Sequence, residues 1–216
     1  FMDEIRACVG YHQFKELAGI DITKEPMEVG PTTHYAMGGI RVDGETQMST
    51  VPGLFAAGEC AAGLHGANRL GGNSLSDLLV FGKRSGEHAA NYAKNNGDVS
   101  ITQDQVDAAG HWALEFFNRK TDENAYQIQS DLQVDMQDLA GIVRREDELA
   151  QVLDKLESFK ERAEKVGVIG NREYNSGWHT AMDLRNLMTC SEAIALAALQ
   201  RRESRGAQFR DDYPDK

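Results

Sequence analysis

The chain has 216 residues, of which 41% are hydrophobic, so it is long enough to bury a core in one or two domains. Its 34 acidic residues outnumber its 23 Lys and Arg, which gives a formal net charge of -11. No basic stripe accompanies that charge, so nucleic acid is not an expected partner. No apolar run is long enough to span a membrane, and the three widely spaced cysteines favour a reducing compartment over disulfides or a zinc site.

The N-terminal part of the chain predicts a helix, a connection and a hairpin. Residues 1–17 carry apolar side chains at roughly helical spacing, and Gly19 is placed to end that helix. Residues 20–31 hold two of the four prolines, which is typical of an extended connection between units. Residues 40–49 alternate around an Asp-Gly pair, so we expect two short strands joined by a turn. Because the chain opens on Phe1 and not on Met, we expect a piece of a longer protein.

The most informative stretch is residues 51–81, VPGLFAAGECAAGLHGANRLGGNSLSDLLVF. Its apolar start, residues 51–57, predicts a short buried strand, and a loop with five glycines follows. Leucines at helical spacing then predict a helix to about residue 95, with Asn73 or Ser74 as its cap. A glycine-rich loop that leads into a helix directs backbone N–H groups and the positive end of the helix dipole at a ligand. That arrangement suits an anion or an electron-rich ring edge.

Beyond residue 98 glycines become rare and four long amphipathic patterns follow. Both Ser100 with Gln103 and Thr102 with Gln105 have the spacing of a capping box at the start of the first pattern. Helices that each carry one apolar face and follow one another closely predict an antiparallel bundle. The helices are expected over residues 102–119, 123–139, 146–166 and 177–202.

Four side chains are candidates for binding or chemistry. Glu59 directly follows the apolar run and Gly58, where an acid can accept hydrogen bonds from the hydroxyls of a ribose or ribityl chain, although a solvated turn acid explains it as well. Arg69 lies among glycines, where its guanidinium can hold a carboxylate, with a surface charge as the alternative. His34 and His65 can each donate to an anion or transfer a proton, with a structural histidine as the alternative. No GxGxxG follows a strand and no HxxxH or HExxH occurs, so neither a pyrophosphate cradle nor a metal site is predicted.

Three motifs resemble the flavoprotein subunit of succinate dehydrogenase and fumarate reductase: HYAMGG at 34–39, VPGLFAAGE at 51–59 and HGANRLGGNSL at 65–75. A fourth stretch, RRESRGAQFRDDYP at 201–214, resembles the ESRGAH segment of the same subunit. The motifs occur in the family's order and at its spacing, and they cover the chain nearly end to end.

The resemblance implies an α+β fragment from the C-terminal part of that subunit. A strand-loop-helix piece of an FAD-binding α/β domain would be followed by the antiparallel helical bundle. Residues 1–33 would be the end of the capping domain and a connection, residues 34–97 the last part of the FAD-binding domain, and residues 98–216 the helical domain and tail.

The resemblance also implies roles for particular residues. By match to the family's motifs, His34 and Arg69 would bind the substrate carboxylates, and Glu59 would hold the ribityl chain of FAD. Ser74 and Leu75 would meet the pyrimidine side of the flavin through their backbone. The cofactor-binding set implied by the motifs is Glu59, Asn73, Ser74 and Leu75. Carbonyls around the HYAMGG and GE segments hold an alkali cation in the family, which here would lie near Met37 and Glu59.

Departures from the family's pattern limit what this chain is expected to do. The dinucleotide fingerprint, the histidine that links FAD covalently and the arginine that delivers the proton lie upstream in the family, so this chain holds no expected catalytic residue and should be inactive alone. Gln208 stands where the family usually has histidine, and no role is assigned to it. Gly71 and Gly72 replace the Ala-Ser that is typical of aspartate-oxidising relatives, which favours a dicarboxylate substrate.

The resemblance implies a parent that interconverts succinate and fumarate and passes electrons from FAD to an iron–sulfur subunit. Membrane anchor subunits would hold that complex, and the chain would lie peripherally at the cytoplasmic face of the cell membrane. A helical docking module for a partner subunit is an alternative, because more than half of the chain is amphipathic helix. Part of an L-aspartate oxidase-like flavoenzyme is another.

Overall fold

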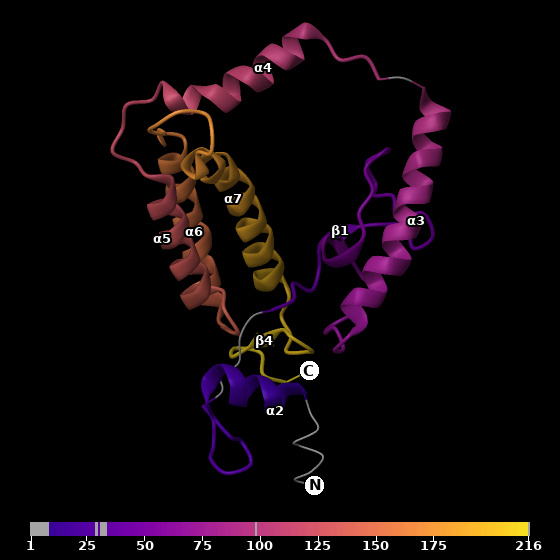
Figure 1. Cartoon of the computed structure of the whole chain (residues 1–216), viewed down its shortest axis with the longest axis vertical. Helices are drawn as coiled ribbons and strands as arrows, with labels where there is room; N and C mark the ends of the chain where they lie inside the picture. Colours follow the sequence, from indigo (N-terminus) through magenta and orange to yellow (C-terminus); the bar gives the residue numbers. More distant parts are fainter. Residues whose placement is uncertain (1–8, 29, 31–33, 98, 216) are drawn as a thin grey trace. The chain divides into compact units, whose positions relative to one another are not determined.

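A computed structural model of the chain describes residues 9–28, 30, 34–97 and 99–215, which divide after Thr32 into two units (Figure 1). The first unit holds a short helix, α2 (Val9–Gln13), which continues as a π-helical turn, η1 (Phe14–Ala18). Gly19 ends it in the left-handed conformation at φ 70, as the sequence predicts. Residues 1–8 of the predicted helix lie outside the described residues.

The second unit begins with a hairpin and a pair of parallel strands. Strand β1 (Ile40–Arg41) pairs with β2 (Ala61–Ala62), so that Ile40 lies opposite Ala61. Val42 bridges Ser49 in the antiparallel sense, which confirms the predicted hairpin over 40–49. The Asp43 carboxylate shapes its turn by accepting hydrogen bonds from two following backbone N–H groups, at 3.1 and 2.8 Å.

The prediction of a buried strand over residues 51–57 is wrong. The Leu54 N–H donates to the carbonyl of Val51 at 3.1 Å, so the Pro-Gly pair makes a tight turn inside the apolar run. Phe55 alone pairs, in an isolated bridge with Met48, and the turn leaves too few residues for a ladder. Val51 and Leu54 are 57% and 44% exposed. The strand forms instead at β2, after a 3-10 turn, η2 (Gly58–Cys60), within the predicted loop.

Helix α3 (Asn73–Asn96) has the predicted extent but not the predicted cap. Gly72 occupies the cap position at φ 85, and no side chain of Asn73 or Ser74 accepts a hydrogen bond from the first turn. A left-handed residue at this position is readily adopted by glycine, which has no Cβ to clash. The first-turn amides of α3 are therefore not satisfied by a capping side chain.

The helices of the C-terminal half start and end close to their predicted bounds. The Thr102 and Gln105 capping box is present, and the side chains of Asn124 and Asn175 cap two later helices. The first helix ends earlier than predicted because its last turn tightens into a 3-10 helix, η3 (Glu115–Phe117). The helices are α4 (Gln103–Leu114), α5 (Ala125–Leu139), α6 (Glu146–Ala163) and α7 (Ser176–Gln200).

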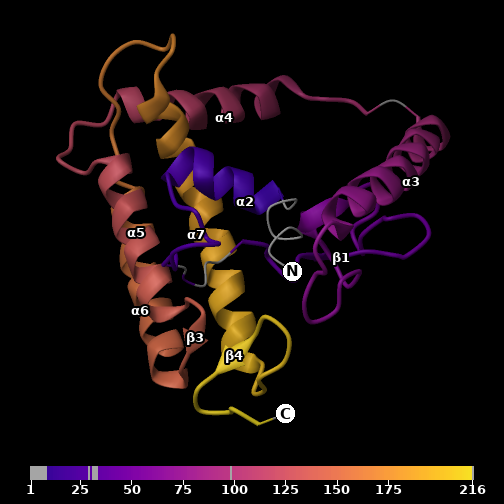
Figure 2. The same ribbon diagram turned by 60° about the horizontal axis from the view of Figure 1, so that its bottom comes forward.

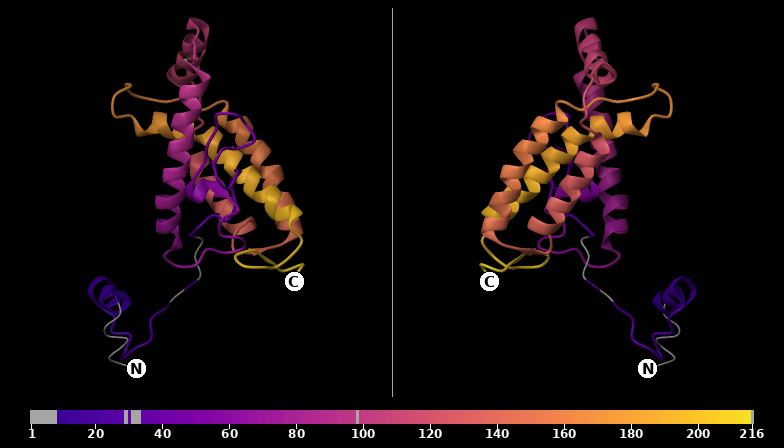
Figure 3. Two further views of the ribbon diagram at one scale, coloured as in Figure 1. Left: turned by 90° about the vertical axis from the view of Figure 1, so that its right-hand side faces the viewer. Right: turned by 90° about the vertical axis from the view of Figure 1, so that its left-hand side faces the viewer.

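Helices α5, α6 and α7 lie side by side, with α6 antiparallel to both neighbours, as Figures 2 and 3 show. Their apolar faces meet in two hydrophobic clusters, and in the larger one Ile128, Leu156 and Leu184 are at most 1% exposed. The predicted first helix joins this core through Phe116 of η3, and the Trp178 Nε1–H donates to the carbonyl of Ala113 at 2.6 Å. The antiparallel bundle is therefore confirmed. None of the helices in the described ranges combines the length and hydrophobicity that crossing a bilayer requires.

The polar tail is built into one end of this bundle. Strand β4 (Phe209–Arg210) pairs in parallel with β3 (Val143–Arg144) (Figure 2). Arg210 is fully buried, and its guanidinium donates to the carbonyl of Ala198 at 2.8 Å and pairs with Asp212 at 2.7 Å. A buried guanidinium with several acceptors fixes the chain on which it lies.

Candidate functional site

Glu59 joins the HYAMGG segment to the turn that precedes the glycine-rich loop. Its Oε1 accepts a hydrogen bond from the backbone N–H of Ala36 at 2.8 Å. Gly39, at φ 126, packs so closely that a Cβ there would lie 2.7 Å from the carbonyl carbon of Cys60. Only glycine fits both the conformation and the contact. The two motif segments therefore form one surface, on which the Glu59 side chain remains exposed.

Arg69 lies over the ring of Tyr35, and its guanidinium carbon is 4.6 Å from the ring centroid. This cation–π contact holds a planar cation without using its hydrogen-bond donors. One donor, Nη1, is used by the carbonyl of Leu70 at 3.1 Å. The Nε atom is buried and has no hydrogen-bond partner among the described residues. A buried donor left unpaired costs about 1–3 kcal/mol, so a ligand acceptor at this position would be favoured.

A buried acid, Asp77, contacts Tyr35, on whose ring Arg69 lies. Asp77 is 5% exposed, accepts a hydrogen bond from the Tyr35 hydroxyl at 3.5 Å and lies 3.3 Å from Nε2 of His65. The pKa of the Tyr35 hydroxyl is raised by burial and by the nearby Asp77 carboxylate. Sequence reasoning missed both Tyr35 and Asp77. The available signal was one acid within the apolar helical run from Leu75 to Phe81.

Two of the predicted site residues, Arg69 and Glu59, each contact the HYAMGG segment that carries His34. Arg69 lies on Tyr35, the residue that follows His34, and the His34 side chain is exposed. His65 joins the Asp77 group and does not point to an independent site. No group of three or more His, Cys, Asp or Glu side chains within the described ranges is close enough to hold a metal ion.

Asn73, Ser74 and Leu75 form the first turn of α3. The Asn73 amide donates to the carbonyl of Leu70 at 3.2 Å, and the Leu75 amide donates to the carbonyl of Gly72 at 3.3 Å. The Ser74 amide has no backbone acceptor in the part of the chain that the structure describes. Of these three residues, each predicted to contact the flavin, Ser74 is therefore the one whose backbone N–H can donate to a ligand.

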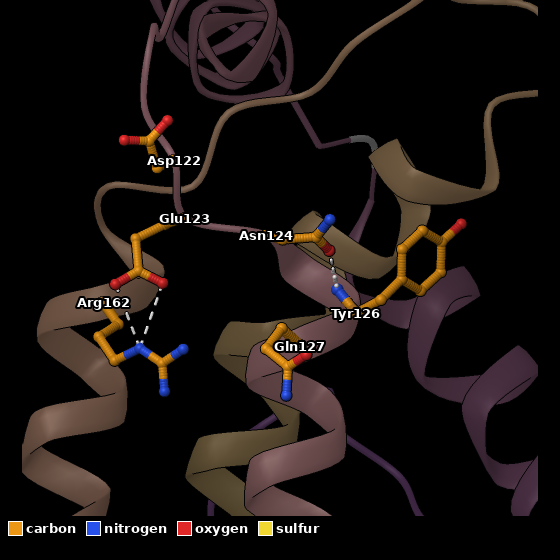
Figure 4. A pocket seen from close by; sticks show the side chains of 6 residues that line it. All are labelled: Asp122, Glu123, Asn124, Tyr126, Gln127 and Arg162. Atoms are coloured by element: carbon orange, nitrogen blue, oxygen red, sulfur yellow. Dashed lines mark hydrogen bonds and ion pairs between the residues drawn. The ribbon is translucent and has the colours of Figure 1, made fainter.

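A polar pocket of about 390 Å³ lies elsewhere, beside the start of α5, and Figure 4 shows its lining. The Arg162 Nε donates to both carboxylate oxygens of Glu123 at 3.2 Å, and its Nη1 lies 2.9 Å from Asp131. The hydrogen bond that Arg162 donates to Asp131 raises the pKa of Arg162, so this guanidinium stays charged and is paired within the protein. This group links α6 to α5 and the segment before it, and its one guanidinium is already paired with two carboxylates.

Two family models match the chain. A model described as an FAD binding domain matches residues 3–75, and one described as Fumarate reductase flavoprotein C-term matches residues 129–216. The succinate dehydrogenase flavoprotein subunit of Coxiella burnetii is 38% identical over 214 residues, which cover 94% of this chain and 36% of the relative. This chain belongs to the succinate dehydrogenase and fumarate reductase flavoprotein family.

Solved flavoproteins of this family have the same fold. Sdh1 of Mycobacterium smegmatis, solved in complex with UQ1, has a TM-score of 0.88 and 52% identity, with 99% of this chain and 36% of that chain covered. The FrdA chain of E. coli quinol fumarate reductase has a TM-score of 0.84 and 34% identity, with 97% and 37% covered. The chain thus spans about a third of the length of the flavoproteins that it matches.

The residues present fit one side of a flavin. The FAD-binding match ends at Leu75, in the turn where the Ser74 amide lacks an acceptor. Gly71 and Gly72 have open space where a Cβ would stand, so a flat group can approach the backbone there. The positive end of the α3 dipole favours negative charge at the same place.

Proposed function

We propose that the protein containing this chain is an FAD-dependent flavoprotein subunit that interconverts succinate and fumarate. The observation that carries this proposal is the Arg69 guanidinium, which is held on Tyr35 and whose buried Nε has no hydrogen-bond partner among the residues that the structure describes. Such a group is ready to bind a carboxylate through two parallel hydrogen bonds. His34, adjacent in sequence to Tyr35, would bind the second carboxylate of the substrate.

Within that subunit, Glu59, Asn73, Ser74 and Leu75 would hold FAD. The Ser74 amide and the N-terminal end of α3 would stabilise negative charge at the edge of the flavin ring. When bound, FAD supplies the hydride-transfer chemistry that amino acid side chains lack.

The role of this chain's residues would be orientation. Two carboxylates held at fixed points place the central carbons of the substrate, so that the reaction no longer depends on random encounters. Arg69 and His34 carry positive or hydrogen-bonding groups for that purpose, and we assign no proton-transfer role to either. The chain by itself is therefore expected to be inactive.

The proposed partners are an iron–sulfur subunit that accepts the electrons and membrane anchor subunits that place the complex at the cytoplasmic face of the cell membrane. Similarity to flavoprotein subunits of such complexes supports this assembly. The bundle of α5, α6 and α7, which has a core of its own, supports a docking role for residues 100–216 as a second function. A truncation to these residues that folds and binds an iron–sulfur subunit would support that role, and one that folds without binding would oppose it.

Arg69→Lys in the intact flavoprotein tests the main proposal. Lysine keeps the charge but loses the planar fork, so kcat/KM for succinate should fall by about 100-fold or more, the cost of breaking a buried charged pair. Oxidation of succinate with a dye acceptor measures it, and flavin absorbance reports whether FAD is retained.

Arg84→Lys is the matched control, because Arg84 pairs with Glu45 on the exposed surface of α3 and should tolerate the change. An Arg69→Lys enzyme with unchanged kcat/KM contradicts the proposal. Turnover of aspartate in place of succinate by the unmodified protein would instead assign it to the aspartate-oxidising relatives.

A further inference from the structure

The loop that carries Arg69 has little structure of its own. It connects β2 to α3 without a helix or strand, and Gly63, Gly66 and Gly72 all have positive φ angles, at 105, 58 and 85. Residues of this type give a backbone many accessible conformations. The contact with Tyr35 orients the guanidinium, and Nε2 of His65 in the same loop lies 3.3 Å from the Asp77 carboxylate, but both are side-chain contacts and neither fixes a peptide of the loop.

A turn of the C-terminal tail supports the backbone of the loop. It contacts the loop at Ala67, two residues before Arg69. The Ala207 N–H donates to the carbonyl of Ala67 at 3.0 Å. Gly206, at φ 65, lies so close that a Cβ there would be 2.5 Å from the carbonyl carbon of Ala67. The two turns are adjacent in both Figure 1 and Figure 2. A hydrogen bond and a tight backbone contact thus fix one peptide of the glycine-rich loop.

The turn itself is rigid and well anchored. Arg205 and Gln208 exchange two backbone hydrogen bonds, at 2.9 and 3.2 Å, which close it. Gln208 is 6% exposed, and its side chain accepts from the Arg144 guanidinium at 2.6 Å and donates to the carbonyl of Arg201 at 3.2 Å. The fully buried Arg210 holds the next strand against the end of α7. The support therefore extends from the helical bundle to the loop.

We propose that the tail turn, residues 205–208, is a positioning element for Arg69 and so sets the affinity for dicarboxylates. The inference rests on the proposed role of Arg69 in binding a carboxylate. Without the tail turn, the loop would keep its charge and its sequence but would lose the peptide geometry that places the Arg69 guanidinium. Gln208, to which the sequence assigned no role, becomes one of its anchors.

Gly206→Ala in the intact flavoprotein is the direct test. The added methyl group has to displace the Ala67 peptide, and a displacement of about 1 Å at a binding group costs on the order of 100-fold. We expect the KM for succinate and the Kd for malonate to rise by about 10- to 100-fold, with kcat at saturation much less affected. Malonate is a suitable probe because its single methylene carbon cannot be dehydrogenated, so calorimetry measures binding without turnover.

Gly170→Ala is the matched control, because Gly170 also has a positive φ, at 101, and lies in the loop between α6 and α7. The same backbone strain arises there without pressure on Ala67, so malonate affinity should stay unchanged. Equal losses in the two variants would show that backbone strain alone explains the effect and would overturn the proposal.

A double-mutant cycle with Arg69→Lys identifies the route of the effect. If the turn acts through Arg69, Gly206→Ala should add little to the loss already caused by Arg69→Lys. A fully additive loss overturns the proposal. Should Gly206→Ala not fold, Gln208→Met carries the same test, since it keeps the volume and removes the anchor, and should weaken malonate binding about 3-fold or more.

The two proposals fail in different ways. If the proposed function is wrong, Arg69→Lys leaves malonate binding unchanged or the unmodified protein does not bind malonate. If only the positioning role is wrong, Arg69→Lys weakens binding while Gly206→Ala and Gln208→Met do not.

Discussion

Within this chain, the bundle of α5, α6 and α7 buries many of its apolar residues, whereas the segment over residues 34–97 leaves most of its own at least partly exposed. The chain spans about a third of the length of the flavoproteins that it matches. In the bundle, Ile128, Leu149 and Val152 are 0% exposed and lie in its hydrophobic clusters. In the segment, Leu75 and Leu79 are 69% and 76% exposed, and Ala56 is its only buried hydrophobic residue among those described. Burial of apolar surface supplies most of the stability of a fold, so the bundle carries that stability. The segment carries the candidate site and is held by polar contacts and close glycine packing.

Loss of a core leucine gives the largest expected difference between the two regions. Leu156→Ala removes a side chain that is 1% exposed in the bundle core, and the free energy of unfolding should fall by about 2–5 kcal/mol. Leu79→Ala, the matched change on α3, should shift it by less than about 0.5 kcal/mol. Urea unfolding measures both. Equal losses would break the contrast between the regions.

Removal of the buried guanidinium tests the polar end of the bundle. Arg210→Met keeps much of the volume but leaves the carbonyls of Ala198 and Leu199 without their donor. The free energy of unfolding should fall by about 2 kcal/mol, the cost of stranding buried acceptors. Arg172→Met, in the α6–α7 loop, is an exposed control. A neutral Arg210→Met would mean that the tail contributes nothing to bundle stability.

A buried charge is the corresponding feature of the segment. Asp77→Asn keeps the shape but removes the carboxylate that helps to raise the pKa of Tyr35, so that pKa should move back toward its ordinary value. The free energy of unfolding should fall by about 1 kcal/mol because two hydrogen bonds weaken. NMR of ring-labelled tyrosine follows the titration, with Asp104→Asn on α4 as the control. An unshifted Tyr35 would separate Asp77 from the Arg69 support.

The smallest expected effect is a change in stability at low pH. The hydrogen bond from Arg210 lowers the pKa of Asp212 from 3.8 to about 2. Because the folded value lies below the unfolded one, Asp212 stabilises the fold above about pH 4, and this contribution is lost as the pH falls toward 2. Asp212→Asn should therefore lose less stability than the unmodified chain over that window in acid unfolding. Asp154→Asn, on the exposed face of α6, should follow the unmodified curve, and coincident curves for all three would contradict the assignment.

Local patterns predicted the bundle, the hairpin over 40–49 and the extent of α3 well, and the other details of the segment poorly, for one physical reason. Apolar spacing and capping residues such as Thr102 act within a few positions of the chain, and the helices follow them. The turn inside residues 51–57, the left-handed Gly72 and the buried acid Asp77 depend on what the rest of the chain presents to them. Sequence spacing carries no information about those contacts.

In the C-terminal tail, too, local sequence patterns do not show which residues are buried. The tail is polar in composition, which gives no sign of burial, yet Arg210 is fully buried and Gln208 is 6% exposed. The family resemblance located His34, Arg69, Glu59, Asn73, Ser74 and Leu75 as candidates, and their roles remain predictions. Tyr35 and the support from Ala207 emerged only from the coordinates, since neither residue type is distinctive in sequence.

The hydrogen bond between Ala207 and Ala67 also has a consequence for biosynthesis. Ribosomes deliver the glycine-rich loop long before they deliver the tail turn, so the nascent loop emerges without its brace. The bundle between them can assemble first and present the turn afterwards. Ligand affinity would then mature late in translation, and polypeptides that stall before the turn would carry His34 and Arg69, the side chains proposed to bind carboxylates, without the support for the Arg69 loop.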